Sequence, residues 1–178
     1  PADMERIMEI ARENNLKVIS DTAQAPLAKE NNKLAGTISD IGGFSLNYHK
    51  HIHTGEGGII VTDIDEYAER LQLIRNHAEA VVGSKGITNL TNMVGYNFRL
   101  GEIEAAIGIE QLKKLDNIIL SRQRIAQKLT NGLSGLKGLS TPTVSKDSTH
   151  AYYIYAMKLD IEKIGVPRSR IIEALEAE

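Results

Sequence analysis

The sequence contains no cysteine among its 178 residues. A disulfide framework and a thiolate metal site are therefore excluded, and the composition is compatible with a reducing compartment. No apolar run approaches the roughly 20 residues that a membrane-spanning helix needs. The first residues are charged from Asp3 onward and lack the pattern of a signal sequence. We therefore expect a cytoplasmic protein with no membrane association.

An excess of charge of either sign is also missing. The 21 basic and 23 acidic residues are interspersed and give a net charge of −2. Proteins that bind nucleic acid usually carry a basic face toward the phosphates, so we expect no nucleic-acid partner. With 42% hydrophobic residues, the chain is long enough for one core, or for one core and the beginning of a second.

Neither end of the sequence shows a natural boundary. Pro1 leads almost at once into a helical pattern, and the helical pattern of residues 168–178 stops without a cap. We expect the sequence to be an internal part of a longer protein.

Helix and strand patterns alternate in the first part of the chain. Asp3 can cap a helix that ends at Asn14 and Asn15. Strands are predicted at 16–19, at 38–46 with an interruption at Gly42 and Gly43, and at 57–62. A helix is predicted at 65–76, with Tyr67, Leu71 and Ile74 facing inward. This order predicts an α/β fold, in which functional residues gather at the carboxyl ends of the strands.

The second part is predicted to be more helical. Residues 80–92 contain glycines and little periodicity, which predicts a loop. One long helix is predicted at 101–129, with its apolar face formed by Ile103, Ile107, Leu112, Leu115, Ile119, Ile125 and Leu129. A strand is predicted at 151–159. We expect a domain boundary near residues 136–148, so that 1–135 form part of a first domain and 136–178 begin a second.

Lys50 lies in a short polar loop after a predicted strand, and the run T-G-E-G-G follows at residues 54–58. A lysine amine attacks an aldehyde when its surroundings favour the neutral amine, and a crowded loop at a strand end can provide such surroundings. A single loop lysine is more often a solvated surface charge. Lys50 is therefore a candidate whose role depends on its neighbours.

Two strand-end residues strengthen this candidate. A carboxylate at Asp21 could keep a proton on a pyridine nitrogen, as an electron-sink cofactor requires, although a turn or cap is an equal alternative. Ser45 precedes Lys50 by five residues and could donate to a phosphate oxygen or simply bond to the backbone. The combination favours pyridoxal phosphate (PLP) chemistry.

Three histidines, at 49, 51 and 53, could suggest a metal site. Alternate residues of an extended loop converge on one ion only if the backbone bends, and no acidic residue has a matching spacing. We predict no metal. The glycines at 55, 57 and 58 are followed by no phosphate-binding lysine and indicate a turn into the next strand.

Four blocks of residues occur in an order and spacing that resemble the DegT/StrS family of PLP-dependent sugar aminotransferases. They are S-D-T-A-Q at 20–24, G-F-S-L-N-Y-H-K at 43–50, T-G-E-G-G at 54–58 and G-Y-N-F-R at 95–99. The stretch at 103–115 is also similar to the family. The resemblance covers residues 1–135 closely and the remainder loosely.

The resemblance implies fold type I, like that of aspartate aminotransferase, with part of the large domain and the start of the small C-terminal domain. It implies PLP as cofactor and a homodimer with active sites at the subunit interface. The implied reaction moves an amino group, usually from glutamate, to a keto sugar linked to a nucleotide, in cell-surface polysaccharide or secondary-metabolite sugar biosynthesis.

The resemblance also assigns roles to residues. Lys50 matches the catalytic lysine that carries PLP, and Asp21 matches the partner of its pyridine nitrogen. Gln24 matches the residue beside the ring and its 3-hydroxyl, and Ser45 matches a phosphate ligand. Asn97 matches an asparagine that reaches the cofactor phosphate of the neighbouring subunit.

His51, Glu56 and Arg99 lie in the matching blocks and are candidates for the substrate site. The family's upstream phosphate loop and the aromatic residue that covers the ring are absent from this sequence, so these residues form an incomplete site. Some relatives carry histidine in place of the lysine and are sugar-nucleotide dehydratases, and others are regulatory. Both remain alternatives to amino transfer.

Overall fold

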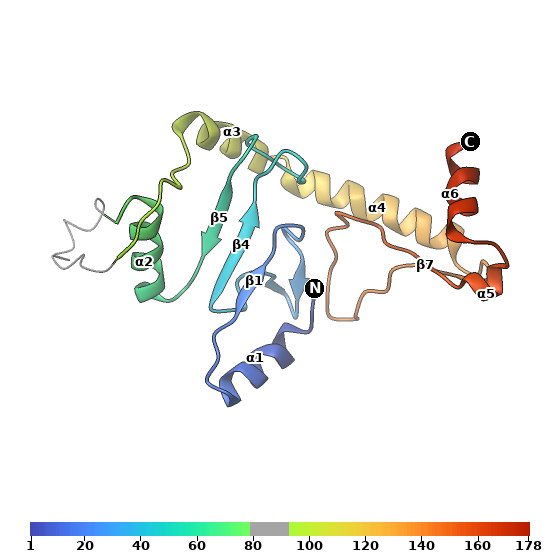
Figure 1. Cartoon of the computed structure of the whole chain (residues 1–178), viewed down its shortest axis with the longest axis horizontal. Helices are drawn as coiled ribbons and strands as arrows, with labels where there is room; N and C mark the ends of the chain where they lie inside the picture. The colour runs from blue at the N-terminus through green and yellow to red at the C-terminus, as the bar shows by residue number, and fades with distance from the viewer. Residues whose placement is uncertain (79–92) are drawn as a thin grey trace.

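The computed structural model describes residues 1–78 and 93–178. Its centre is a three-stranded sheet formed by β1 (Ile19–Asp21), β4 (Ile41–Ser45) and β5 (Gly58–Val61), in the order β1-β4-β5 (Figure 1). Strands β1 and β4 are parallel, with Asp21 opposite Gly43, whereas β4 and β5 are antiparallel. The carboxyl ends of β1 and β4 therefore lie at the same edge of the sheet.

The first predicted strand is shifted along the chain. Residues 16–18 precede β1 because Leu16 still donates its N–H to the carbonyl of Ala11 at the end of the preceding helix, and Val18 donates to the Asp40 carboxylate at 2.9 Å. The predicted interruption of the next strand by glycines is wrong, since β4 runs through Gly42. A Cβ at Gly42 would overlap the carbonyl oxygen of Gly36, so the glycine permits close backbone packing.

Two helices and a hairpin accompany the sheet. Helix α1 (Met4–Glu13) is capped by Asp3 as predicted. The hairpin of β2 (Lys29–Glu30) and β3 (Lys33–Leu34) turns at two asparagines with positive φ. Helix α2 (Asp65–Arg75) also matches its prediction, but its buried residue is Leu73, whereas the three residues expected to face inward are half-buried.

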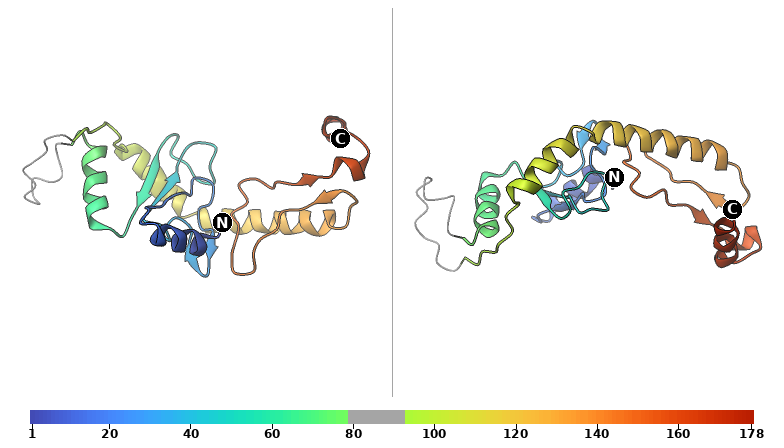
Figure 2. Two further views of the ribbon diagram at one scale, coloured as in Figure 1. Left: turned by 60° about the horizontal axis from the view of Figure 1, so that its bottom comes forward. Right: turned by 90° about the horizontal axis from the view of Figure 1, so that it is seen from above.

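The predicted long helix is two helices, α3 (Glu102–Leu112) and α4 (Leu115–Leu133), which are separated at Lys113 and Lys114. Together they run along one side of the molecule (Figure 2). Of the predicted apolar face, only Leu115 and Ile119 are buried. The other members are exposed, and the side chain of Ile103 is 74% exposed.

The C-terminal part contains β6 (Leu139–Ser140), β7 (Lys158–Leu159), α5 (Ile161–Ile164) and α6 (Arg168–Glu176). The strand predicted at 151–159 is therefore wrong over residues 151–157. Tyr152 has a positive φ of 50°, and the carbonyls of His150 and Tyr152 accept hydrogen bonds from side chains of α4. An extended strand cannot satisfy these contacts.

Residues 147–149 return to the first part of the chain. Asn31 donates its N–H to the carbonyl of Asp147 at 2.8 Å, and Thr149 donates to the carbonyl of Lys29 at 2.8 Å. The domain boundary near 136–148 stays a prediction. The predicted loop at 80–92 lies outside the described residues.

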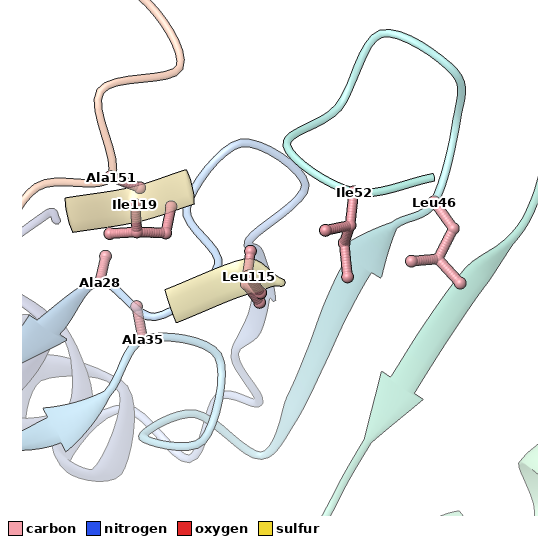
Figure 3. Packing of buried hydrophobic residues seen from close by; sticks show 7 residues of the cluster. All are labelled: Ala28, Ala35, Leu46, Ile52, Leu115, Ile119 and Ala151. Carbon is pink, nitrogen blue, oxygen red and sulfur yellow. The ribbon is translucent and has the colours of Figure 1, made fainter. Parts of the chain in front are cut away.

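The main apolar cluster joins three parts of the chain (Figure 3). Its members are Ala28, Ala35, Leu46, Ile52, Leu115, Ile119 and Ala151. Leu46 and Ile52 flank the Lys50 turn, so this cluster holds the turn against α4 and the C-terminal segment. None of the helices described, in either part of the chain, is long and apolar enough to cross a membrane.

Candidate functional site

Lys50 lies in a closed turn between β4 and β5. Leu46 donates its N–H to the carbonyl of Gly57 at 2.8 Å, and its own carbonyl accepts from the N–H of Thr54 at 3.0 Å. These bonds close the base of the turn. Lys50 itself donates its N–H to the carbonyl of Asn47 at 2.9 Å.

Asn47 is the centre of the polar contacts inside this turn. Its N–H donates to Ser45 Oγ at 3.2 Å, and its Oδ1 accepts from the N–H of His49 at 3.1 Å. Its Nδ2 donates to Glu56 Oε1 at 2.8 Å. Sequence analysis missed Asn47 because a loop asparagine has no distinguishing pattern. Glu56 holds the turn through this bond, and its assignment to the substrate site stays a prediction.

The Lys50 amine points away from these contacts. Its side chain is half-buried, and Nζ lies 4.9 Å from the centre of the Tyr153 ring. Among the residues that the structure describes, Nζ has no carboxylate or hydrogen-bonding partner. Lys50 lines a cavity of about 200 Å³ whose other members include Ala23, Ser45 and His51.

Asp21 and Ser45 lie on a second, larger hollow over one face of the sheet. This hollow, of about 1060 Å³, also includes Gly43 and Leu71. Ala23 and Ser45 line both cavities, so the hollow that includes Asp21 adjoins the cavity that includes Lys50. Asp21 is exposed and accepts the N–H of Ala23 through Oδ1 at 3.0 Å. Gln24 follows on the surface.

The residues predicted farther along the chain lie elsewhere. Asn97 and Arg99 are exposed on a segment that runs beside the end of α2 (Figure 1). Asn97 forms an isolated bridge with Asn76, and Arg99 Nη1 donates to Asn76 Oδ1 at 2.9 Å. Neither lines the Lys50 cavity. A role for Asn97 across a subunit interface stays a prediction.

His51 is buried, with 6% of its surface exposed. Its Nε2 lies 3.0 Å from the carbonyl oxygen of Ala151, and because a carbonyl only accepts, Nε2 carries the proton. Burial lowers the pKa of His51, and the bond to Ala151 partly opposes this effect. Its Nδ1 is buried and has no partner in the described parts of the chain. His51 is therefore a neutral residue that holds the turn.

The free groups of this region fit PLP. Ser45 Oγ accepts the Asn47 N–H and keeps its own hydrogen for a phosphate oxygen. Asp21 Oδ2 has no partner within residues 1–78 and 93–178, which leaves a carboxylate oxygen for a protonated ring nitrogen. The amine of Lys50 is equally free. By contrast, no group of three or more His, Asp or Glu residues that could hold a metal occurs in these two ranges.

The sequence model of the DegT/DnrJ/EryC1/StrS aminotransferase family matches residues 1–178. An uncharacterised protein of Methanocaldococcus jannaschii is 35% identical over 182 residues, which cover 99% of this chain and 47% of that protein. The GDP-perosamine synthase of Caulobacter vibrioides is 34% identical over 176 residues, covering 98% of this chain and 46% of that protein. The chain thus spans about half the length of these relatives.

Solved structures show the same likeness. An aminotransferase from Psychrobacter cryohalolentis superposes with a TM-score of 0.87 and 29% identity, covering 97% of this chain and 48% of that one. GDP-4-keto-6-deoxy-D-mannose-3-dehydratase of Escherichia coli with bound hydrated PLP gives a TM-score of 0.85 and 29% identity, covering 99% of this chain and 48% of that one. The fold is therefore that of fold type I PLP enzymes, and PLP is the indicated cofactor.

Proposed function

Because the chain belongs to the DegT/DnrJ/EryC1/StrS aminotransferase family, we propose that the whole protein transfers an amino group to a keto sugar linked to a nucleotide, with PLP held at Lys50. The observation that carries the proposal is the parallel pairing of β1 and β4. This pairing brings Asp21, Ser45 and the Lys50 turn to one edge of the sheet. The amino donor in this proposal is glutamate.

Bound PLP supplies an electron sink for charge that develops on the substrate carbon. Lys50 would hold the cofactor through Nζ, and the same amine would carry a proton to and from the substrate carbon. Asp21 Oδ2 holds the proton on the ring nitrogen, which matters most when negative charge builds up. Ser45 Oγ binds the phosphate.

The remaining assignments complete the proposed site. Gln24 would lie beside the ring and its 3-hydroxyl. Asn97 would contact the cofactor phosphate in the other subunit of a homodimer, and His51, Glu56 and Arg99 would surround the substrate. The proposed location is the cytoplasm.

The test uses the full-length protein. We expect a yellow protein whose absorbance band is lost on borohydride reduction, with the reduced cofactor found on the peptide that contains Lys50. Lys50→Ala should abolish the attachment, whereas Lys33→Ala, which removes an exposed lysine at the start of β3, should not. A full-length protein that stays colourless in excess PLP would overturn the proposal.

A sugar-nucleotide dehydratase is the second candidate, favoured by the likeness to the E. coli dehydratase structure. The family resemblance includes a few dehydratases that carry histidine at the position that matches Lys50. In this chain that position is Lys50, and both neighbouring histidines have other contacts. The ring centre of His49 lies 3.8 Å from that of Tyr48, and His51 Nε2 donates to the carbonyl of Ala151. The free amine of Lys50 favours amino transfer. An amino sugar formed from glutamate would support transfer, and loss of a hydroxyl without one would support dehydration.

A non-catalytic regulatory role is the third candidate function. Such a protein would bind PLP without exchanging amino groups with any donor. The free functional groups at Asp21, Ser45 and Lys50 favour turnover over this alternative.

A further inference from the structure

We propose that Tyr153 is a positioning residue for the Lys50 amine, an inference that rests on the proposed function. Nζ lies 4.9 Å from the centre of the Tyr153 ring. Tyr153 comes from the C-terminal part of the chain, which sequence analysis assigned to another domain. The contact therefore adds to the lysine turn a residue that no motif indicated.

Three side chains hold the segment that carries this ring. His51 Nε2 donates to the carbonyl of Ala151, and Arg122 Nη1 donates to the carbonyl of Tyr152 at 3.1 Å. Gln123 Nε2 donates to the carbonyl of His150 at 3.1 Å. Three successive carbonyls are thus fixed by groups from the Lys50 turn and from α4. These bonds hold the backbone immediately before Tyr153.

The backbone of this segment bends at Tyr152, just before the residue that contacts Lys50. Tyr152 has a φ of 50°, and its N–H donates to His150 Nδ1 at 2.8 Å. Ala151 is 2% exposed and belongs to the main apolar cluster. Ala151, which is buried, precedes Tyr152, and Tyr153, which contacts Lys50, follows it. Tyr153 is thus attached to a buried part of the chain beside the lysine turn.

An aromatic face suits an amine that must be held and then used. It attracts an ammonium group through its electrons, yet it accepts no strong hydrogen bond from the nitrogen. A carboxylate in the same place would keep the charge on the amine and compete for its hydrogens. Since Lys50 has a long, flexible side chain, the ring limits the positions that Nζ visits while the amine stays reactive.

The charged and titratable groups around the Tyr153 ring do not replace it as the group that holds the Lys50 amine. The His51 ring centre lies 5.7 Å from that of Tyr153, and burial lowers the His51 pKa, so this neighbour is neutral. Arg122 uses Nη1 to hold the backbone of Tyr152. The hydroxyl of Tyr153 has no bonding partner in the described parts of the chain, so the ring face alone should be sufficient.

The experiment measures two rates on the full-length protein. The first is covalent uptake of PLP by the apoprotein, followed by absorbance, and the second is steady-state amino transfer. Tyr153→Leu should slow uptake about two- to five-fold, the range expected for losing an amine–ring contact. Its kcat should fall by a similar factor while KM for glutamate stays unchanged, because the contact that the variant removes is with the lysine. Tyr153→Phe, which keeps the ring face, should behave like wild type.

The matched control is Tyr67→Leu. Lys17 Nζ lies 5.9 Å from the centre of the Tyr67 ring, so this variant removes a similar lysine–tyrosine contact on α2, outside the Lys50 cavity. It should leave both rates unchanged. If the melting midpoint of Tyr153→Leu falls, Tyr153→Met, with a flexible side chain of similar length, replaces it in both measurements.

The possible outcomes are distinct. A wild-type protein that takes up PLP at Lys50, together with a Tyr153→Leu variant that takes it up equally fast, overturns this inference and leaves the proposed function intact. A loss in Tyr153→Phe as large as in Tyr153→Leu overturns it as well, since the hydroxyl would then be the active group. A wild-type protein with no PLP on Lys50 overturns the proposed function and this inference together.

Discussion

His51 Nε2 and the carbonyl oxygen of Ala151 lie 3.0 Å apart, although the two residues are separated by 100 positions in the sequence. This bond joins the lysine turn to the segment that carries Tyr153. It requires a proton on Nε2, and burial, which lowers the pKa of His51, favours the neutral form of the ring. Protonation of His51 would therefore place a charge in the buried contact between the turn and this segment.

The first prediction concerns stability below neutral pH. In the unfolded chain His51 protonates below a pKa of about 6.5, whereas its pKa in the folded protein is lower. Between these two pKa values the unfolded state binds more protons than the folded state. The contribution of His51 to the free energy of unfolding is therefore fully present above about pH 6.5 and is lost as the pH falls from there through the lower, folded-state pKa. Melting midpoints at about pH 7.5 and about pH 5.5 measure the effect.

His51→Gln is the control for this titration. The glutamine amide can donate to the Ala151 carbonyl but has no proton to gain in this range. We expect its melting midpoint to fall less than that of wild type between the two pH values. The pKa of His150 is also lowered, mainly by burial, so a smaller dependence should remain in the variant. Equal falls in both proteins would contradict the assignment to His51.

A second prediction concerns the amide at the centre of the lysine turn. Asn47→Ala removes the side-chain bonds to His49 and Glu56, which should lower the free energy of unfolding by about 1–2 kcal/mol. Attachment of PLP to Lys50 should slow because the turn is less well defined. Chemical denaturation and absorbance after PLP addition provide the two measurements.

Two substitutions at Glu56 distinguish the role of its hydrogen bond to Asn47 from the role of its charge. Glu56→Gln keeps an oxygen that can accept from Asn47 Nδ2, whereas Glu56→Ala does not. If the role of Glu56 is to hold the turn, the glutamine variant should attach PLP at the wild-type rate and the alanine variant should resemble Asn47→Ala. A glutamine variant as slow as the alanine variant would instead indicate a role for the charge.

A third prediction tests the close packing of β4. In Gly42→Ala the new methyl group would overlap the Gly36 carbonyl, which is backbone and cannot rotate away. We expect a loss of about 3 kcal/mol or more in the free energy of unfolding. Gly43→Ala is the matched control, because its Cβ would meet only the Ser20 carbonyl oxygen, at 3.9 Å. Similar losses in the two variants would refute the steric explanation.

A fourth prediction concerns the carboxylate at the end of β1. Asp21→Asn keeps an oxygen for the N–H of Ala23 but cannot keep a proton on a pyridine nitrogen by charge. Amino transfer should fall by about 100-fold or more, while PLP should still attach to Lys50. Borohydride trapping and steady-state kinetics on the same sample distinguish the two steps, and unchanged turnover would exclude the proposed role.

The positions of Asp21 and Ser45 at strand ends and of Lys50 in the turn that follows β4 could be expected from short-range patterns in the sequence. The strands pair in register, and this pairing brings the three residues together. Their proposed functions in cofactor binding stay predictions. The family resemblance supplied the roles, and the structure supplied the two adjoining cavities that Ser45 lines together with Asp21 and with Lys50.

Other features had no local signal. The break between α3 and α4 occurs at Lys113 and Lys114, and lysine is a good helix former, so neither residue predicts an interruption. Tyr153 was placed on a strand because the segment alternates loosely. The contacts that override this pattern come from α4 and His51, at separations that local periodicity does not report.

The long separation between His51 and Ala151 has a consequence for the order of folding. Strands β1, β4 and β5 all lie between residues 19 and 61, so they can pair while a growing chain has not yet reached Ala151. Contacts between distant residues also close more slowly than local ones. We expect the lysine turn to take shape early in synthesis and to acquire its aromatic neighbour late, so that the nascent chain passes through a stage in which the amine has no ring beside it.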